Sequence, residues 1–367
     1  MAINLIFVDR DGAETHFIKK MYYLRYSIVD RGGPLELTAT IPIDLIANPI
    51  KRLDDVKLYD GLDLIWFGRV KEIPRVSVSR EAAVLTAEGF VGHLKDERVD
   101  PTLSLPDSSD QIIQSVLTAN NTKQTIPVIS TDFSRMSTGT FDVTTFDVDI
   151  STTPLTLIKR ANAFDSFDWG FNDLDVNGKP RFTWEDHDRT VVDYKVGLRR
   201  VNLQLQGRSL DDVYNKAYVS YGDFSEEVRS GTDDLLDARG LSRAISLGDL
   251  SLTQADAQQV GDSFLNDKRN ASKGTLIVTT SIFDNKGRTV PVHRILPGRN
   301  ILIYDLEPDE EDLTTISSSD VINGKNVFKI TQVDVDFGNK TASLELDVPN
   351  DRLDIMLSRI GNVEAGE

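Results

Sequence analysis

Short apolar runs separated by Gly, Asn and Asp dominate the chain. The clearest group covers residues 56–60, 64–71 and 82–87, with a turn at Gly61 between the first two runs. β-branched and aromatic residues bounded by Gly and Asp are typical of strands joined by tight turns. We therefore expect three consecutive strands across residues 56–87.

A similar group of runs recurs near the C-terminus, at residues 301–305, 327–333 and 342–346. In this comparison Tyr59 of the first group corresponds to Tyr304 of the second. Two copies of one β-unit in a single chain indicate a duplicated module. The alternative, that apolar strands of two meanders look alike by chance, remains open at this point.

The remainder of the N-terminal region continues the β pattern. Residues 3–8 and 22–29 predict strands, and residues 35–43 alternate, with Leu35, Leu37, Ala39, Ile41 and Ile43 between polar neighbours. Alternation at period two places one face of a strand in the core and the other in solvent. We predict a first β-domain over residues 1–98.

The pattern changes in residues 99–200, where we predict an α+β insertion. Ser108-Ser109-Asp110 is a helix start before an apolar face of Ile112, Ile113, Val116 and Leu117. Thr153-Pro154 predicts a second short helix, with Thr as the N-cap and Pro in the first turn. Residues 167–184 predict a hairpin around Asn177-Gly178.

Alternation returns from Val201, and we predict a second β-domain over residues 201–349. It contains one helix, residues 253–270, with Ala257, Val260, Phe264 and Leu265 as its buried stripe. Residues 223–250, acidic and rich in glycine, predict a long loop. Residues 307–320 predict a solvated acidic loop inside the second copy of the β-unit.

The last segment, residues 350–367, predicts a C-terminal helix and tail. Leu353, Met356, Leu357 and Ile360 fall at i, i+3, i+4 and i+7, which makes one apolar stripe. So short a helix is marginal alone, so the stripe must be covered. The stripe packs either on its own domain or against a neighbouring subunit or a downstream tip protein, and in the second case these four residues form the predicted interface.

Composition adds exclusions to this mainly β fold with an α+β insertion. The 367 residues include no cysteine, which excludes disulfides and thiolate chemistry, and the formal net charge is −17, which argues against a phosphate-binding groove. No run of 18 apolar residues predicts a membrane span. The first residues read as a strand and not as a signal peptide.

Candidate chemistry is sparse. His16, His93, His187 and His293 have no metal-ligand spacing, and Asp186-His187-Asp188 reads as a polar strand end. Residues 173–178 match the first half of a calcium loop, but Trp184 replaces its final Glu, so a hairpin turn is the better interpretation. We predict no catalytic residue, no metal and no cofactor, and we expect that the protein is not an enzyme.

The strongest enzyme or carbohydrate-binding candidate is the hairpin of residues 167–184. Its aromatic residues Trp169, Phe171 and Trp184 lie near Asp168, Asp173 and Glu185 in sequence. Sugar clefts place aromatic platforms beside paired carboxylates. The alternative, which we favour, is aromatic packing across the two strands.

The whole pattern resembles the baseplate-hub or tail-tip hub proteins of tailed bacteriophages and related contractile injection machines. The resemblance covers most of the chain and rests on the Tyr59-Asp60 and Trp66-Phe67-Gly68-Arg69-Val70 phrase, the α+β insertion and the closing residues 348–354. It implies two tail-tube-like β-domains, of barrel or sandwich form, in each chain. No single motif is diagnostic of this family.

The resemblance also implies partners and a place. Three copies would form a homotrimeric, pseudo-hexameric ring that joins the six-fold tail tube to the three-fold tip. A tail-tube or distal tail protein would lie above it, and a tip, fibre or spike protein below. DNA would pass through the channel without specific binding. The expected location is the phage tail tip in the virion, assembled in the host cytoplasm, without stable membrane insertion. The alternative function is a carbohydrate-binding or carbohydrate-active β-protein.

Overall fold

The computed structural model describes residues 3–9, 11–46, 50–76, 81–100, 108–124, 128–139, 148, 152–165, 167–185, 191–197, 200–206, 214–222, 225–231, 240–248, 253–269, 273–279, 281–304 and 327–346. Within these residues, 17 strands belong to one hydrogen-bonded sheet system and three form a separate small sheet. The predicted fold class, mainly β with an α+β insertion, is confirmed. The C-terminal residues Leu353, Met356, Leu357 and Ile360, and the acidic loop 307–320, lie outside the described residues.

The first β unit consists of seven strands, and each sequence-predicted strand in this region is present. Leu37, Ala39 and Ile41 are fully buried, as their alternation predicts, but Leu35 is 41% exposed. The ladder between the third and fourth strands is irregular between Tyr26 and Ile28, opposite this part of the fourth strand, and there the alternation fails. The strands are β1 (Ile3–Val8), β2 (Glu14–Ile18), β3 (Tyr23–Val29), β4 (Arg31–Pro42), β5 (Asp55–Asp60), β6 (Asp63–Val76) and β7 (Ala82–Glu88).

The second β unit contains the predicted C-terminal meander, in which two antiparallel ladders join its last three strands. It begins with a short strand that pairs in parallel with the first strand of that meander. Its strands are β10 (Tyr194–Gly197), β11 (Val201–Gln206), β15 (Lys273–Val278), β16 (Ser281–Asp284), β17 (Thr289–Pro291), β18 (Arg299–Tyr304), β19 (Val327–Asp336) and β20 (Thr341–Leu346).

The two units repeat one topology over five strands. In the first unit the order across the sheet is β3-β4-β7-β6-β5, and every neighbouring pair is antiparallel. In the second unit the order is β11-β15-β20-β19-β18, again with every pair antiparallel. A 3₁₀-helix that follows a proline precedes β5 and β18 alike, η1 (Ile43–Leu45) after Pro42 and η5 (Val292–Arg294) after Pro291. The predicted agreement in strand order and direction is therefore confirmed.

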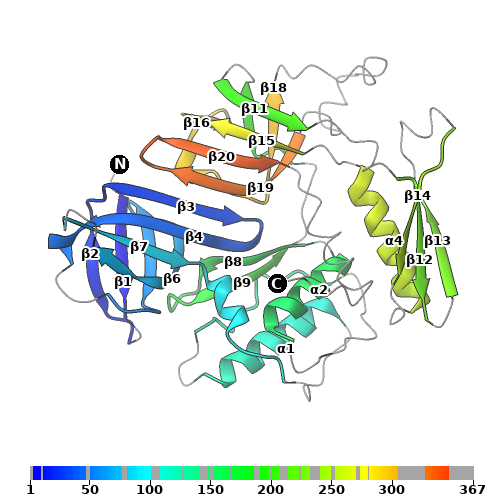
Figure 1. Cartoon of the computed structure of the whole chain (residues 1–367), viewed down its shortest axis with the longest axis horizontal. Coiled ribbons are helices and arrows are strands. Elements are labelled where there is room, and N and C mark those ends of the chain that lie inside the picture. Colours follow the sequence, from blue (N-terminus) through cyan, green and yellow to red (C-terminus); the bar gives the residue numbers. More distant parts are fainter. Residues whose placement is uncertain are drawn as a thin grey trace.

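The insertion packs two helices on a hairpin (Figure 1). Helix α1 (Ser109–Thr122) begins after Ser108, and α2 (Pro154–Asp165) begins after Thr153, whose hydroxyl accepts the backbone N–H of Thr156. Strands β8 (Asp168–Leu174) and β9 (Pro180–Glu185) form the predicted hairpin, and Gly178 adopts a φ of 77° in its turn. The helices and the hairpin share a core with the 3₁₀-helix η2 (Phe90–Lys95).

The hairpin reaches the first unit through close backbone contact. Strand β8 pairs in parallel with the start of β4, where Gly32 pairs with Gly170. A Cβ on Gly170 would lie 2.4 Å from the carbonyl carbon of Gly32, and Gly170 has a φ of 152°. Only glycine meets both conditions without strain. The glycines therefore position the insertion against the first β unit.

A small α/β unit interrupts the second β unit between β11 and β15. It contains β12 (Lys216–Tyr221), β13 (Ser225–Ser230), β14 (Ala244–Gly248) and α4 (Gln254–Arg269), and the apolar stripe predicted for this helix is buried. The prediction of a long loop over residues 223–250 is wrong, because β13 and β14 lie in it. Strand β13 is polar and largely exposed, so no apolar alternation marked it. Ladders to β12 and the Arg229–Asp262 ion pair hold these elements together.

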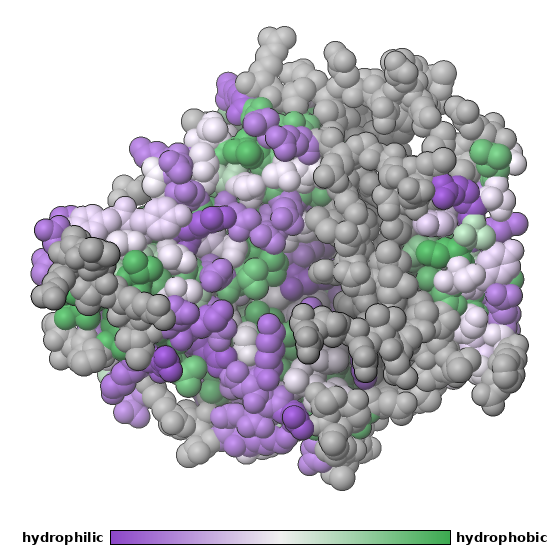
Figure 2. Space-filling model, viewed as in Figure 1, coloured by the Kyte–Doolittle hydropathy of each residue, from purple (hydrophilic) through white to green (hydrophobic). Residues whose placement is uncertain are grey.

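The two β units share one hydrophobic core. Leu5, Trp66 and Leu85 of the first unit belong to the same buried cluster as Leu276, Ile301 and Val335 of the second. On the face shown in Figure 2, hydrophobic side chains reach the described surface only in small groups among hydrophilic ones. None of the helices in the described ranges is long and apolar enough to cross a membrane. The domain boundaries predicted from the sequence remain a prediction.

Candidate functional site

The aromatic hairpin of the insertion is a packed core and not a sugar platform. Trp169 is 2% exposed, and Phe171 and Trp184 are fully buried. Period two places Trp169 and Phe171 on one face of β8, and Trp184 pairs directly with Trp169 across the hairpin. Helices α1 and α2 cover this face. The favoured prediction of cross-strand packing is confirmed. The carbohydrate-binding alternative requires exposed aromatic rings, and these three rings are buried.

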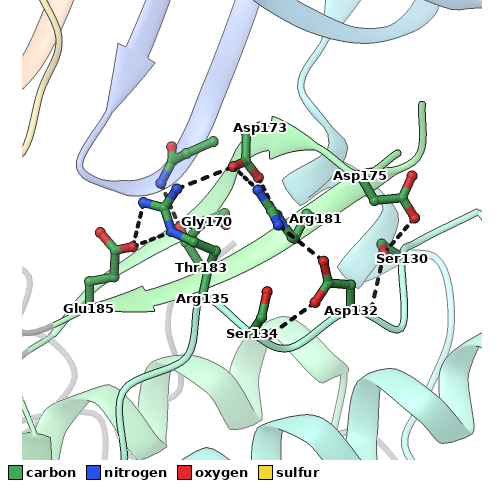
Figure 3. Close-up of polar contacts among 11 residues, drawn as sticks. Ser130, Asp132, Ser134, Arg135, Gly170, Asp173, Asp175, Arg181, Thr183 and Glu185 are labelled. Carbon is green, nitrogen blue, oxygen red and sulfur yellow. Dashed lines mark hydrogen bonds and ion pairs between the residues drawn. The ribbon is translucent and has the colours of Figure 1, made fainter. Parts of the chain in front are cut away.

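The carboxylates of the same hairpin are engaged in ion pairs (Figure 3). Arg135 lies between Glu185 and Asp173, at 2.5 and 3.3 Å. Arg181 lies between Asp173 and Asp132, at 2.5 and 3.0 Å. A general acid needs a carboxyl group whose proton is held near neutral pH, and a neighbouring guanidinium has the opposite effect. This network therefore fits a structural role.

The segment that resembles half a calcium loop is a hairpin turn. The Asp175 carboxylate accepts the backbone N–H groups of Asn177 and Lys179, both at 2.9 Å, and the hydroxyl of Ser130 at 2.7 Å. Burial acts to raise the pKa of Asp175, but these hydrogen bonds lower it below its ordinary value. The Asp175 carboxylate, one of the oxygens that calcium would need, is therefore already occupied by the turn. Across the described ranges no group of acidic, His or Cys side chains could hold a metal ion.

The histidines in the described residues lie apart from one another. His16 is buried and lies 3.0 Å from the Thr15 hydroxyl. His93 lies beside Arg69, and burial, followed by that guanidinium, lowers the pKa of its imidazole. His293 belongs to a contact between the two β units. His187 and its acidic neighbours lie outside the described residues.

Buried ion pairs join the described parts of the molecule where these parts meet. The ammonium group of Lys329 in β19 lies 2.6 Å from Asp30, which connects β3 to β4, and forms an ion pair with Asp168 in β8. Lys329 is 8% exposed, so the pairs are shielded from water. One side chain of the second β unit therefore joins the first unit and the insertion.

A second contact joins the first β unit to η5 of the second. Asp60, at the end of β5, accepts hydrogen bonds from Arg294 at 2.7 Å and pairs with His293 at 3.0 Å. Burial acts to raise the pKa of Asp60, but the contacts with His293 and Arg294 prevail and lower it. Asp63, at the start of β6, lies 2.8 Å from Arg294. The Tyr26 hydroxyl donates to the carbonyl of His293 at 2.7 Å.

Backbone pairing completes this junction. Residues 25–29 of β3 pair with residues 332–336 of β19 in an antiparallel ladder. Strand β20 occupies one edge of β19. The other edge, which faces β3, also pairs with β18, but only over residues 327–330. The portion of β19 that extends beyond β18 is thus covered by the first β unit (Figure 1). The sheet runs without interruption from one unit into the next.

The equivalent edges elsewhere in the chain are uncovered. Strand β6 pairs with β5 over residues 63–69, and among the described strands none pairs with that edge over residues 71–76. Strand β11, the counterpart of β3, pairs with β15 on one edge, and its other edge has no partner strand within the described chain. Unpaired strand edges readily accept another chain. The two uncovered stretches, β11 and residues 71–76 of β6, are thus the counterparts of the two that pair inside the chain, β3 and the far part of β19.

Sequence reasoning missed these junction residues. Lys329, Asp30, Asp60 and His293 occur in segments that read as ordinary strands and turns. One available signal was the duplication itself, because two copies in one chain must meet. The lysine inside an apolar strand, Phe328-Lys329-Ile330, was a second signal, since a buried lysine requires a carboxylate.

The architecture is similar to that of solved phage tail proteins. The chain aligns with a 43 kDa tail protein of prophage MuSo2 from Shewanella oneidensis over 96% of this chain and 99% of that one, with a TM-score of 0.65 and 12% identity. A tail protein from Neisseria meningitidis MC58 aligns over 96% and 98%, with a TM-score of 0.62 and 11% identity.

A third structure, prophage tail protein gp18 from Listeria monocytogenes EGD-e, aligns over 97% of this chain and 99% of that one, with a TM-score of 0.59 and 11% identity. No protein-family model matches the sequence, and no curated protein matches it. The chain therefore has the fold of these phage tail proteins along nearly its whole length.

Proposed function

We propose that the protein is a structural component of a phage tail, a hub at the tail tip that forms a trimeric, pseudo-hexameric ring. The observation that carries this proposal is the repeated five-strand order of the two β units. Three copies would supply six equivalent units, which matches a six-fold tube above and a three-fold tip below. The shared fold with phage tail proteins supports the same role.

The junction inside the chain supplies a template for the junction between chains. Within one chain, β3 of the first unit pairs with the far part of β19. The counterparts are β11 and residues 71–76 of β6, which are the uncovered edges. In a ring, β11 of one copy would pair antiparallel with residues 71–76 of the next. Head-to-tail contacts form a closed ring when a whole number of the rotations that relate neighbouring units makes a full turn. Here the rotation that relates the two β units within one chain would be repeated between chains.

This proposal assigns the polar features of the hairpin to stability and not to catalysis. Of the carboxylates that could serve a hydrolase, Asp173 and Glu185 pair with Arg135 and Arg181, and Asp168 pairs with Lys329. The aromatic rings beside them are buried. The ring would surround a channel through which DNA passes without specific binding. An overall charge of −17 per chain is compatible with passage of a polyanion that must not adhere. Tail-tube and tip proteins would be its neighbours in the virion.

Cysteine cross-linking tests the ring at the level of single residues. The natural chain has no cysteine, so every disulfide formed is an engineered one. Gln204→Cys on the free edge of β11 combined with Glu72→Cys on β6 should give covalent trimers on a non-reducing gel. Disulfides require Cα atoms within about 7 Å, so only adjacent strands react. The control pair, Gln204→Cys with Val176→Cys in the exposed β8–β9 turn, should stay uncross-linked.

Light scattering and electron microscopy of the purified protein give the independent test. A ring of three copies with six similar lobes is expected. A monomer at all concentrations, or a symmetric dimer, would contradict the proposal. A particle that turns over a cell-wall polysaccharide, with loss of turnover in Asp173→Asn, would favour the carbohydrate-active alternative.

A further inference from the structure

A basic, aromatic groove lies on the outside of the first β unit. Phe17, Tyr22, Pro42 and Leu45 supply its apolar lining. Phe17 is 51% exposed and Tyr22 57%, which is unusual for large aromatic side chains. Exposed aromatic residues around a hollow are typical of a surface that another segment covers.

The charge of the groove is opposite to that of the chain. Lys19 and Lys20 line it, and Asp44 is the one carboxylate among the lining residues. The Lys19 ammonium lies 5.1 Å from the centre of the Phe17 ring, and the Lys20 ammonium lies 5.6 Å from that of Tyr22. In a chain of net charge −17 this pairing of cations with aromatic rings favours an acidic segment that also carries apolar side chains.

The position of the groove in the repeat identifies that segment. The groove is built around η1, through Asp44 and Leu45, and the counterpart of η1 in the second unit is η5. Within the chain, η5 receives the β5–β6 turn, whose Asp60 and Asp63 pair with Arg294. The counterpart of that turn is the β18–β19 connection, residues 305–326. The repeat therefore predicts that this connection meets η1 of a neighbouring copy.

The sequence of the connection fits the groove. Residues 305–312 contain six carboxylates, at Asp305, Glu307, Asp309, Glu310, Glu311 and Asp312, and no basic residue. Leu306 and Leu313 flank this run and can meet the aromatic rings. The β5–β6 turn and this connection would thus bring acidic side chains to the same place in equivalent junctions, against Arg294 in one and Lys19 and Lys20 in the other.

We propose that the groove formed by Phe17, Lys19, Lys20, Tyr22, Pro42 and Leu45 binds the acidic connection, residues 305–313, of a second copy of this chain. This contact rests on the proposed ring. It belongs to the same interface between copies as the β11–β6 ladder, and each copy contributes to both contacts from the same β unit. The second unit of one copy would contribute both β11 and the acidic connection. The first unit of the next copy would contribute both residues 71–76 and the groove.

Zero-length cross-linking of isotopically mixed protein tests which copy supplies the occupant. A carbodiimide joins lysine amines directly to carboxylates, so peptides that contain Lys19 or Lys20 should be joined to peptides that contain Glu310 or Glu311. In an equal mixture of ¹⁴N and ¹⁵N protein, about half of these products should combine one light and one heavy peptide. Products of unmixed label only would assign the segment to its own chain and overturn the proposal.

Charge reversal with rescue tests the energetics in the full chain. Lys19→Glu with Lys20→Glu should weaken ring assembly about tenfold, measured by sedimentation equilibrium, as two reversed ion pairs predict. Combination with Asp309→Lys and Glu310→Lys should restore it. Lys286→Glu with Lys340→Glu, two exposed lysines far from η1 in sequence, is the matched control and should leave assembly unchanged.

The outcomes separate this contact from the ring itself. Assembly of the wild-type ring that is unaffected by reversal at Lys19 and Lys20 would overturn the groove assignment and leave the ring intact. Failure of the wild-type chain to assemble, with no intermolecular cross-link, would remove both. Loss of assembly without rescue, while thermal unfolding is unchanged, would show that the groove binds another tail protein and would overturn the assignment to residues 305–313.

Discussion

The ammonium nitrogen of Lys329 lies 2.6 Å from a carboxylate oxygen of Asp30, although the two residues stand near opposite ends of the chain. The lysine is buried, and it also pairs with Asp168 of the insertion. Bringing three charges into such a place costs desolvation energy, which only close pairing offsets. The position of the three parts relative to one another is therefore tied to one side chain.

Lys329→Met should destabilise the protein by about 3–5 kcal/mol, because two carboxylates lose their shared buried cation. Urea unfolding followed by circular dichroism measures the change. Lys286→Met, in an exposed turn, is the matched control and should alter stability by less than about 0.5 kcal/mol. An equal effect of both substitutions would mean that the buried triad contributes nothing specific.

Asp60→Asn should lower stability at pH 7 by about 2–4 kcal/mol, because His293 and Arg294 lose their buried anionic partner. The pKa of Asp60 lies below its ordinary value in the folded chain, so its contribution is present above about pH 4 and disappears as the pH falls through the folded-state value. The difference in stability between variant and wild type should therefore be smaller at pH 3 than at pH 7. Asp63→Asn, whose side chain is 65% exposed, should cost less than about 1 kcal/mol.

Asp55→Asn should change stability in the opposite direction to Asp60→Asn, and stabilise the protein above neutral pH. Burial, reinforced by Asp54, raises the pKa of Asp55 to about 6 despite Lys57 and Arg69. The folded chain thus binds this proton more tightly than the unfolded chain, and stability is lost as the pH rises through about 6. The asparagine variant should therefore be more stable than wild type at pH 7.5, by up to about 3 kcal/mol, and equally stable near pH 4. A loss of stability at pH 7.5 would contradict this.

Local pattern was enough to predict most strands and helices of the molecule. Leu37, Ala39 and Ile41 mark the buried face of β4, and Ala257, Val260, Phe264 and Leu265 mark that of α4, because burial follows the period of each element. Strands that are polar on both faces cannot be predicted from apolar periodicity. Strand β13 lies on the surface and is stabilised by its partners, so its sequence Ser-Glu-Glu-Val-Arg-Ser carries no alternation of apolar residues.

The duplication indicated that the two units meet, but the partners across the junctions could not be predicted, because they lie in segments that only the tertiary fold brings together. Nothing near Asp30 or Asp60 in sequence indicates Lys329 or Arg294. The aromatic hairpin shows a related limit. Spacing placed Trp169 and Phe171 on one face of β8, but only the packing of α1 and α2 decides that this face is a core and not a binding surface.

Gly170→Ala should destabilise the protein by at least about 3 kcal/mol, because the new methyl group would meet the backbone of Gly32 and Gly33 within 2.5 Å. The loss should be seen as a lower midpoint of thermal unfolding. Gly197→Ala, where a Cβ meets nothing within 4 Å, is the control and should be neutral or slightly stabilising. A neutral Gly170→Ala would show that β4 and β8 can separate at little cost.

The apolar stripe of Leu353, Met356, Leu357 and Ile360 remains a prediction from the sequence. If the stripe forms an interface, charged substitutions in it should prevent assembly but leave the monomer folded. If the stripe packs on its own domain, the same substitutions should also unfold the monomer. We expect Leu357→Asp with Ile360→Asp to release trimers, or the protein below them, and to leave the unfolding midpoint of the monomer unchanged. Arg352→Asp with Ser358→Asp adds charge to the same segment outside the stripe and should leave assembly intact. Loss of folding in the stripe variant would instead assign these residues to the core of their own domain.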